Sequence, residues 1–235
     1  MTFSMRRFSA IFRKEVQDIK TNASVLVMAA MPIMFAFVYQ QMDGPKDQIA
    51  NMVTLMTLIM VGSFVQAALI AEEKEKHTLR VMMLSPTSSL EVLLGKSALT
   101  GLITFVICIS NFAILGVVKG NMVLIILFLL ISIFFFLMLG TAIGLLAKTM
   151  ASTSVVGMPI LFVFFLAPML GEFIKNKFVT KAIEFLPTKH LADAMPKMLA
   201  GKGFSTVSGD LINIIIWCVF SIILCIVVYK KKQMD

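Results

Sequence analysis

The chain has 235 residues, of which 59% are apolar and 14% are charged, and its mean hydropathy is +0.94. A soluble domain carries roughly a quarter charged residues, so this composition excludes an ordinary soluble protein. Apolar runs of about 20 residues recur, which predicts an all-α membrane protein. The net charge of +8 is interpreted as loop charge that orients the spans in the lipid bilayer, and no nucleic-acid partner is expected.

Residues 1–20 predict an amphipathic helix at the membrane surface. Its apolar side chains recur at helical spacing among basic residues: Phe8, Ile11, Phe12, Val16 and Ile19. A basic helix with an aromatic face lies flat in the headgroup region of a bilayer. Two interpretations stay open, a simple membrane anchor and an elbow helix that also touches a cytoplasmic partner.

Six membrane spans are predicted after this helix, at residues 22–41, 49–71, 94–118, 122–147, 152–171 and 211–229. Gly140 and Gly144 in the fourth span form a Gly-x-x-x-Gly pattern, which favours close approach of another helix. Mildly polar residues within the spans are expected to form hydrogen bonds between helices: Gln66, Thr104, Ser110, Asn111 and Thr141.

The distribution of positive charge predicts the orientation of the spans. Six spans place both termini on one side, where all the arginines fall, whereas the short loops of the other side carry only Lys46 and Lys119. By the positive-inside rule the termini are cytoplasmic; lysines within 172–210 oppose this, but long loops follow the rule poorly. We therefore expect a single transmembrane domain over residues 1–235. It comprises an interfacial helix at 1–20, a cytoplasmic coupling segment at 72–93 and an extracellular helical hairpin at 172–210.

The spans carry no residues that suggest chemistry of their own. No ionisable side chain falls in the middle of a predicted span, which argues against a proton- or ion-coupled carrier. No Ser/His, paired-Asp or His-x-x-x-His arrangement is present within the spans, so no catalytic residue is assigned. Cys108, Cys218 and Cys225 lie in apolar runs and are interpreted as small hydrophobes, with no metal site.

A polar stretch separates the second and third predicted spans. A charge cluster that includes Glu72, Glu73 and Glu75 ends the second span, and Leu79, Met82 and Met83 then give a short helix an apolar face. Ser85-Pro86 ends that helix, because a residue before proline disfavours the helical region. The stretch is either a solvated loop with an interfacial helix or a coupling helix that fits a groove on a soluble partner.

Gly95-Lys96-Ser97 is similar to the end of a phosphate-binding loop. Such a loop requires glycine five residues before the Gly-Lys pair, where this chain has Leu90. We therefore expect no ATP binding by the chain itself.

Four motifs resemble those of the type-2 ATP-binding-cassette (ABC) exporter permeases: Glu73-Lys74-Glu75-x-x-Thr78-Leu79, Leu84-Ser85-Pro86, Leu93-Leu94-Gly95-Lys96, and Leu186-Pro187-Thr188-Lys189-His190-Leu191-Ala192-Asp193-Ala194. The six predicted spans and the amphipathic start agree, so the resemblance covers the whole chain. His77 departs from the pattern, because the family usually has glycine there.

The resemblance implies a non-enzymatic membrane subunit of an ATP-driven exporter in the bacterial plasma membrane. A second identical or related permease and two ATP-binding subunits would complete the complex, and those subunits would bind ATP and magnesium. The residues expected to dock onto an ATP-binding subunit are Glu72, Glu73, Glu75, Thr78, Leu79, Met82, Met83, Ser85 and Pro86.

The same resemblance implies that short helices before the last span plug the outer end of the substrate path. Apolar positions recur at helical spacing within 172–210, and Pro187 divides them into two helices. The expected gate residues are Leu186, Pro187, His190 and Leu191.

Two stripes of large flexible side chains are candidates for a substrate path: Met52, Met56 and Met60, and Met158, Phe162, Phe165 and Met169. Methionine is common at promiscuous apolar surfaces, which favours a hydrophobic or amphipathic substrate such as a drug or an antimicrobial or toxin-like peptide. Ordinary helix packing or lipid contact also explains such stripes. Export of a lipid-linked glycan or a cation, and a non-transporting scaffold or assembly partner, remain alternatives.

Overall fold

The computed structural model describes residues 4–42, 44–76, 89–171 and 176–233, and within these ranges every regular element is a helix. This confirms the all-α fold class. Six of the predicted docking residues, Thr78, Leu79, Met82, Met83, Ser85 and Pro86, lie outside the described residues.

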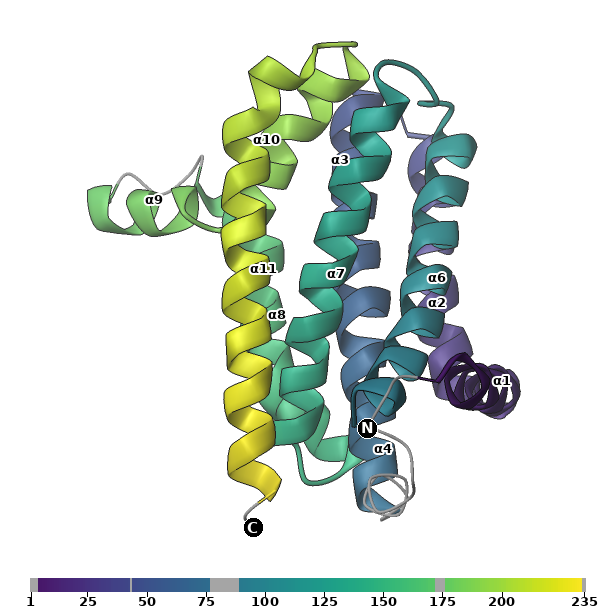
Figure 1. The fold of residues 1–235 in the computed structure, drawn as a ribbon. Helices are drawn as coiled ribbons and strands as arrows, with labels where there is room; N and C mark the ends of the chain where they lie inside the picture. The colour runs from purple at the N-terminus through teal and green to yellow at the C-terminus, as the bar shows by residue number, and fades with distance from the viewer. Residues whose placement is uncertain (1–3, 43, 77–88, 172–175, 234–235) are drawn as a thin grey trace.

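Six helical segments of the described chain are long and apolar enough to cross a membrane, as predicted. They stand side by side in one bundle (Figure 1). Their elements are α2 (Ala23–Gln40), the continuous run of α3 (Lys46–Thr57), η1 (Leu58–Val65) and α4 (Gln66–Glu75), then α6 (Ser89–Leu115), α7 (Met122–Leu146), α8 (Met150–Leu170) and α11 (Phe204–Gln233). Both termini lie at the same end of the bundle, here called the terminal end (Figure 1).

The run α3–η1–α4 is the central span, and it packs against α2, α6, α7 and α8. Gly140 and Gly144 of α7 face the backbone carbonyls of Ser63 and Ala67 on this run so closely that a Cβ atom would collide with them. The predicted close approach at the Gly-x-x-x-Gly pattern is confirmed. The middle of the run, η1, is a π-helix, a rare form that is frequent at functional sites.

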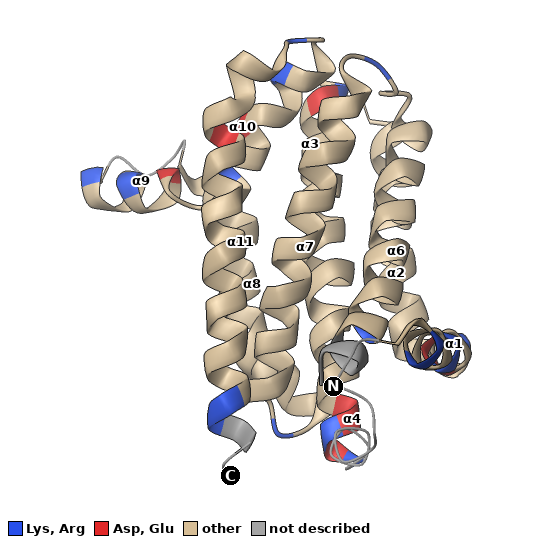
Figure 2. Ribbon diagram, viewed as in Figure 1, with Lys and Arg blue, Asp and Glu red and all other residues tan. Residues whose placement is uncertain are grey.

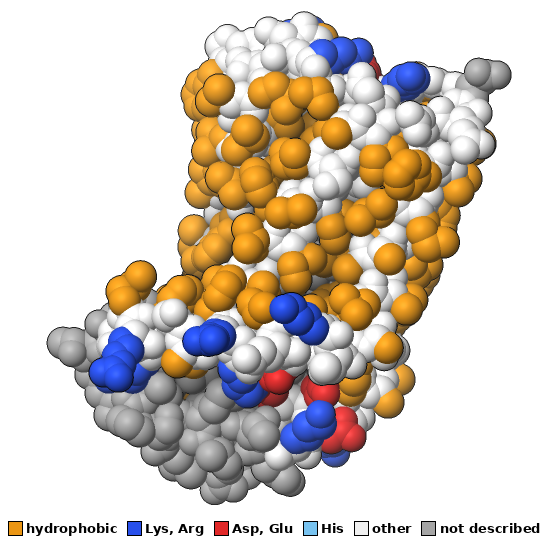
Figure 3. Space-filling view, turned by 90° about the vertical axis from the view of Figure 1, so that its right-hand side faces the viewer, with side chains coloured by type: hydrophobic (Ala, Val, Ile, Leu, Met, Phe, Trp, Pro, Cys, Tyr) orange, Lys and Arg blue, Asp and Glu red, His pale blue; other side chains and the backbone are white. Residues whose placement is uncertain are grey.

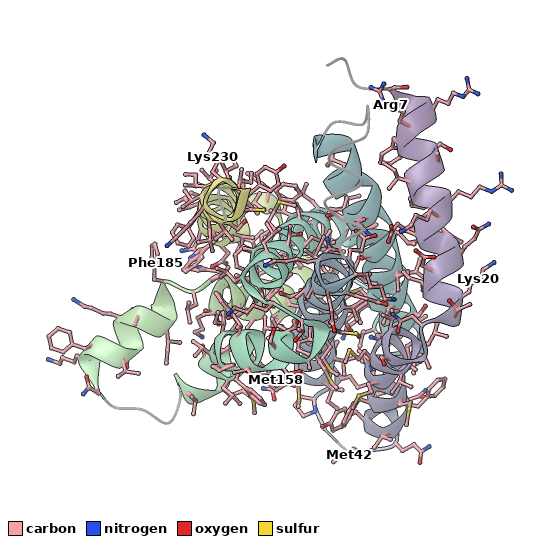
Figure 4. The ribbon with its side chains drawn as sticks, turned by 90° about the horizontal axis from the view of Figure 1, so that it is seen from below. Arg7, Lys20, Met42, Met158, Phe185 and Lys230 are labelled. Atoms are coloured by element: carbon pink, nitrogen blue, oxygen red, sulfur yellow. The ribbon has the colours of Figure 1, made fainter. Side chains whose placement is uncertain are left out.

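Helix α1 (Met5–Thr21) lies across the terminal end of the bundle, at a steep angle to the spans (Figure 1). Ile11 and Ile19 are buried against the spans, while Arg13 and Lys20 are exposed. Seen along the bundle, the helix runs past one side of the spans, with Arg7 and Lys20 near its two ends (Figure 4). This is the amphipathic arrangement that the sequence predicts.

Two short helices precede the last span, divided at Pro187 as predicted. Helix α9 (Lys177–Glu184) projects sideways from the bundle, and its Phe178 is 89% exposed (Figure 1). Helix α10 (Pro187–Leu199) is instead packed among the far ends of α3, α7, α8 and α11. Its buried face contains Leu191, Ala194, Met195, Met198 and Leu199. Only α10 therefore folds back into the bundle.

Charged residues of the described chain gather at the two ends of the bundle and on α9 (Figure 2). On the face that carries α1, apolar side chains cover the middle and Lys and Arg lie at the ends (Figure 3). This apolar band between two charged ends is the surface expected of a chain that spans a bilayer.

Candidate functional site

A groove of about 550 Å³ opens between α2, the central span and α8. Its walls are almost wholly apolar, and we call it the methionine groove. It is lined by Met28, Met31, Phe35 and Tyr39 of α2, Met52 and Met56 of α3, Ile59, Met60 and Phe64 of η1, and Met158, Leu161, Phe162 and Phe165 of α8. Figure 4 marks the side of the groove by Met158.

Six of the seven predicted path residues line this groove together, which joins the two stripes seen in the sequence. The seventh, Met169, lies further along α8, does not line the groove and is 47% exposed. The sequence analysis missed the wall contributed by α2. Met28, Met31, Phe35 and Tyr39 recur at intervals of three and four residues, so the helical spacing of the first span carried that signal.

The groove continues toward the terminal end into a more polar hollow, because Met28 and Phe64 line both spaces. Glu72, Glu75 and Lys76 line this second hollow, together with serines of α2 and α8. The apolar groove therefore has a charged mouth at the end of the bundle where the termini lie.

Four side chains from three helices form an ion-pair cluster beside this mouth. Lys96 of α6 places its Nζ 2.7 Å from Oε1 of Glu15 in α1 and 2.6 Å from Oε1 of Glu73 in α4. Lys14 Nζ lies 3.0 Å from the same Glu73 oxygen and 3.4 Å from Oε1 of Glu15. We call Lys14, Glu15, Glu73 and Lys96 the foot cluster.

The foot cluster is largely shielded from water. Lys96 and Glu15 are each 2% exposed, and Glu73 is 7% exposed. Burial opposes the positive charge of Lys14, but the hydrogen bonds that Lys14 donates to Asp18 and Glu73 and the attraction of nearby carboxylates outweigh it and raise the pKa of Lys14. Buried charges persist only when they are paired in this way.

Close backbone packing supports the cluster. Gly95 lies against Ile11 of α1, and a Cβ atom there would come within 3.1 Å of the Ile11 Cβ atom. The motif that the sequence analysis set aside as a false phosphate-binding loop therefore has a structural role. Its glycine admits α1, and its lysine binds the carboxylates of α1 and α4.

The other charged residues of α4 also bind within the chain. Glu72 pairs with Lys76 at 2.7 Å and accepts a hydrogen bond from Asn22 Nδ2 at 3.0 Å. Lys74 Nζ donates to the carbonyl oxygens of Leu145 and Ala147, at 2.6 and 2.8 Å, at the end of α7.

Glu75 Oε2 accepts a hydrogen bond from the Met150 amide at 2.8 Å, at the start of α8. The three acidic residues predicted to dock onto a partner thus each hold α4 to the rest of the bundle. Of these three, only Glu72 and Glu75 keep part of their surface accessible to a partner protein. Their docking role stays a prediction.

Hydrogen bonds within the spans follow the prediction in part. Gln66 Nε2 donates to Ser97 Oγ and Thr141 Oγ1, and Asn111 Nδ2 donates to Thr57 Oγ1. For Thr104 and Ser110 the prediction was wrong, because each donates to the carbonyl four residues earlier in its own helix. Such internal bonding satisfies a hydroxyl without any neighbouring helix.

At the far end, the predicted gate residues lie where α10 meets the spans. Leu191 and Pro187 are buried, and Leu186 precedes the helix. His190 Nδ1 lies 2.8 Å from Oδ1 of Asp210 in α11. Lys197 binds the other Asp210 oxygen at 3.0 Å. None of the four predicted residues lines the methionine groove, and the sequence analysis missed Asp210, which binds His190 and Lys197 of α10.

The sequence model of the family described as "ABC-2 family transporter protein" matches residues 8–228 of the chain. The chain belongs to the ABC-2 transporter family. A search of curated proteins found no match.

This ABC-2 chain is the permease, the membrane subunit of an ABC transporter. In this family ATP binding lies in separate ATPase subunits, and the membrane domain is typically non-catalytic. Among the described residues of the permease, no group of His, Cys, Asp and Glu side chains is arranged to hold a metal ion. The candidate functional features of the permease are therefore the methionine groove, the foot cluster and the packed helix α10 at the far end.

Proposed function

We propose that this permease exports a hydrophobic or amphipathic molecule and that the methionine groove is its path. The observation that carries the proposal is the lining of that groove, in which seven methionine and aromatic positions from the central span and α8 join four from α2. A volume of about 550 Å³ falls within the range of pockets that hold drug-sized ligands.

The chemistry of the lining supports an apolar substrate. Methionine side chains are flexible and polarisable, so they adapt to apolar molecules of different shape. The described walls offer no charged group and only one hydroxyl, that of Tyr39. A glycan or a bare cation would need polar ligands in place of its lost water, so this lining favours neither.

The flanks of the groove support a second copy of the permease as the partner that closes it. Helices α2 and α8 are the least buried spans of the bundle. Their outward faces carry large apolar side chains, which include Met34, Phe37, Val155 and Val163. A twofold pairing would bring α2 and α8 of each copy to the other, because a two-fold interface uses the same surface on both subunits.

The terminal end supplies the place for the ATP-binding subunits. Helix α4 leads directly into residues 77–88, which contain the predicted docking helix, and its charged residues fix it to α1, α6, α7 and α8. We infer that the termini are cytoplasmic, that two ATP-binding subunits dock there, and that α10 closes the opposite, outer end.

Copurification tests the proposal. The tagged permease is extracted from its native membrane, and the complex is reconstituted in nanodiscs. We expect an ATP-binding protein to copurify and its ATPase rate to rise when hydrophobic dyes or amphipathic peptides are added. A stable complex whose ATPase responds to none of these compounds would contradict the apolar substrate. If no ATP-binding protein associates under any condition, the chain is not an exporter subunit.

A further inference from the structure

We propose that Lys96 is a positioning residue that makes α1 and the foot of α2 move together with α4. Lys96 is the member of the foot cluster that binds a carboxylate on each of these two other elements, Glu15 of α1 and Glu73 of α4. The functional part of this inference rests on the proposed function, since α4 leads into the segment expected to dock onto the ATP-binding subunit.

The placement of Glu73 makes α4 the first link of the connection. Glu73 lies two residues before the end of α4 at Glu75, and residues 77–88 follow. A displacement of the docking segment therefore reaches Glu73 with almost no intervening chain. Lys96 Nζ, 2.6 Å from Glu73, lies within hydrogen-bond distance of that carboxylate.

The second link runs from Lys96 to α1 and on to the groove. Glu15 receives the Lys96 ammonium at 2.7 Å, and α1 ends at Thr21, one residue before Asn22. Asn22 caps α2 by accepting a hydrogen bond from the Val25 amide. Helix α2 then carries Met28 and Met31 of the groove wall. A shift of α1 thus moves the base of that wall.

The other contacts between α1 and α4 are weaker substitutes for Lys96. Lys14 also forms an ion pair with Glu73, but its side chain is 45% exposed and pairs with Asp18 as well. Exposed ion pairs hold two elements together only weakly. The Lys96 and Glu15 side chains are 1% and 2% exposed. Neither charge can therefore be hydrated unless α1 separates from α6.

A buried ion pair is a poor way to add stability, since an apolar pair of similar volume often serves as well or better. What distinguishes it from an apolar contact is its strict geometry. The pair is satisfied only when α1, α4 and α6 keep one relative position, so it favours movement of the three elements as a unit. This separates the proposal from a simple membrane anchor, for which the apolar face of α1 would suffice.

The first measurement needs the permease alone. A cysteine replaces Ile11, which is 8% exposed and lies against Gly95, in a background without the three native cysteines. We expect a maleimide to label this buried cysteine slowly. Labelling should quicken about fivefold or more when the attachment of α1 is loosened by Glu15→Leu or Lys96→Met.

Two features of this design keep it interpretable. Glu15→Leu leaves the Lys96–Glu73 pair intact, so the variant keeps its folded foot even if Lys96→Met does not fold. Asp18→Asn is the matched control, because it removes a carboxylate of the same helix that binds only the partly exposed Lys14 among the described residues. The control should be labelled at the parent rate.

The second measurement uses the complex with its ATP-binding subunit in nanodiscs. Glu15→Leu should lower substrate-stimulated ATPase about fivefold or more while basal ATPase and complex assembly persist.

The outcomes separate the two hypotheses. Unchanged labelling in both loosened variants would overturn the role of Lys96, whatever the complex does. Faster labelling with unchanged substrate stimulation would show that the ion pair holds α1 but is not used in coupling, and would also overturn it. Absence of any ATP-binding partner would instead overturn the proposed function, while the first measurement would still decide the attachment.

Discussion

Gly140 of α7 lies against the backbone carbonyl of Ser63 in the π-helix η1, with no room for a side chain between them. Gly144 makes the same kind of contact one turn further on, against Ala67. This close packing seats α7 on the central span that forms the floor of the methionine groove. The geometry of the groove therefore depends on residues that do not touch it.

Substitution of Gly140 tests this dependence. Gly140→Val should destabilise the purified permease by about 1–3 kcal/mol, the usual cost of overpacking a tight contact, and lower its melting temperature in detergent. Gly209→Val is the matched control, since nothing lies within 4 Å of its Cβ position. Replacing a helical glycine there should leave stability equal or slightly higher. Equal melting of both variants would contradict the close contact.

Lys74 should hold the junction between α7 and α8. Its Nζ donates to two carbonyl groups at the end of α7, and hydrogen bonds from charged groups contribute about 1.5–3 kcal/mol each. Lys74→Met should raise hydrogen–deuterium exchange in residues 145–150 by mass spectrometry. Lys76→Met removes an exposed lysine that pairs with Glu72 and should leave that region unchanged. The prediction fails if the two variants exchange alike.

Asp210 should fix α10 to α11 at the far end. It binds His190 and Lys197 of α10 at once, so Asp210→Asn removes the charge from both contacts. Faster hydrogen exchange in residues 187–199 is the expected result. Asp193→Asn serves as the control because Asp193 pairs with Lys189 within α10 itself. Exchange that rises only in the control would show that Asp210 does not anchor the helix.

The orientation of the bundle can be tested by thiol labelling in intact cells. Lys202 is exposed at the far end, and Arg13 is exposed on α1 at the terminal end. A membrane-impermeant maleimide should label Lys202→Cys in intact cells and should label Arg13→Cys only after the membrane is opened. The reverse pattern would place the termini outside and refute the charge-based topology.

The sequence predicted the elements that depend on local pattern. Hydropathy located the six spans, and Pro187 marked the division of α9 from α10, because both signals act within one helix. The two methionine and phenylalanine stripes also converged on one groove. Each stripe already shared a helix face, and the fold needed only to turn those faces toward each other.

Contacts between distant residues could not be predicted in this way. Lys96 and Glu15 are 81 positions apart, and neither periodicity nor motif indicates that they meet. In the sequence, the Gly-Lys-Ser motif therefore indicated only an incomplete phosphate-binding loop. The anchoring of α10 by Asp210 is a similar case, because it depends on how α10 packs beside α11. The π-helix at 58–65 has the same apolar composition as the neighbouring α-helical spans, so its sequence does not distinguish it.

The most direct test of the account is to fill the methionine groove. Met56→Trp places a larger ring within the lining, while Ile223→Trp adds the same ring to an exposed position on α11. Transport is measured as ATP-driven uptake of an apolar dye or amphipathic peptide into inside-out vesicles that contain the complex. We predict that Met56→Trp lowers uptake about tenfold, equal to about 1.4 kcal/mol, with basal ATPase retained, and that Ile223→Trp transports normally. Undiminished uptake by Met56→Trp would contradict the groove as the substrate path.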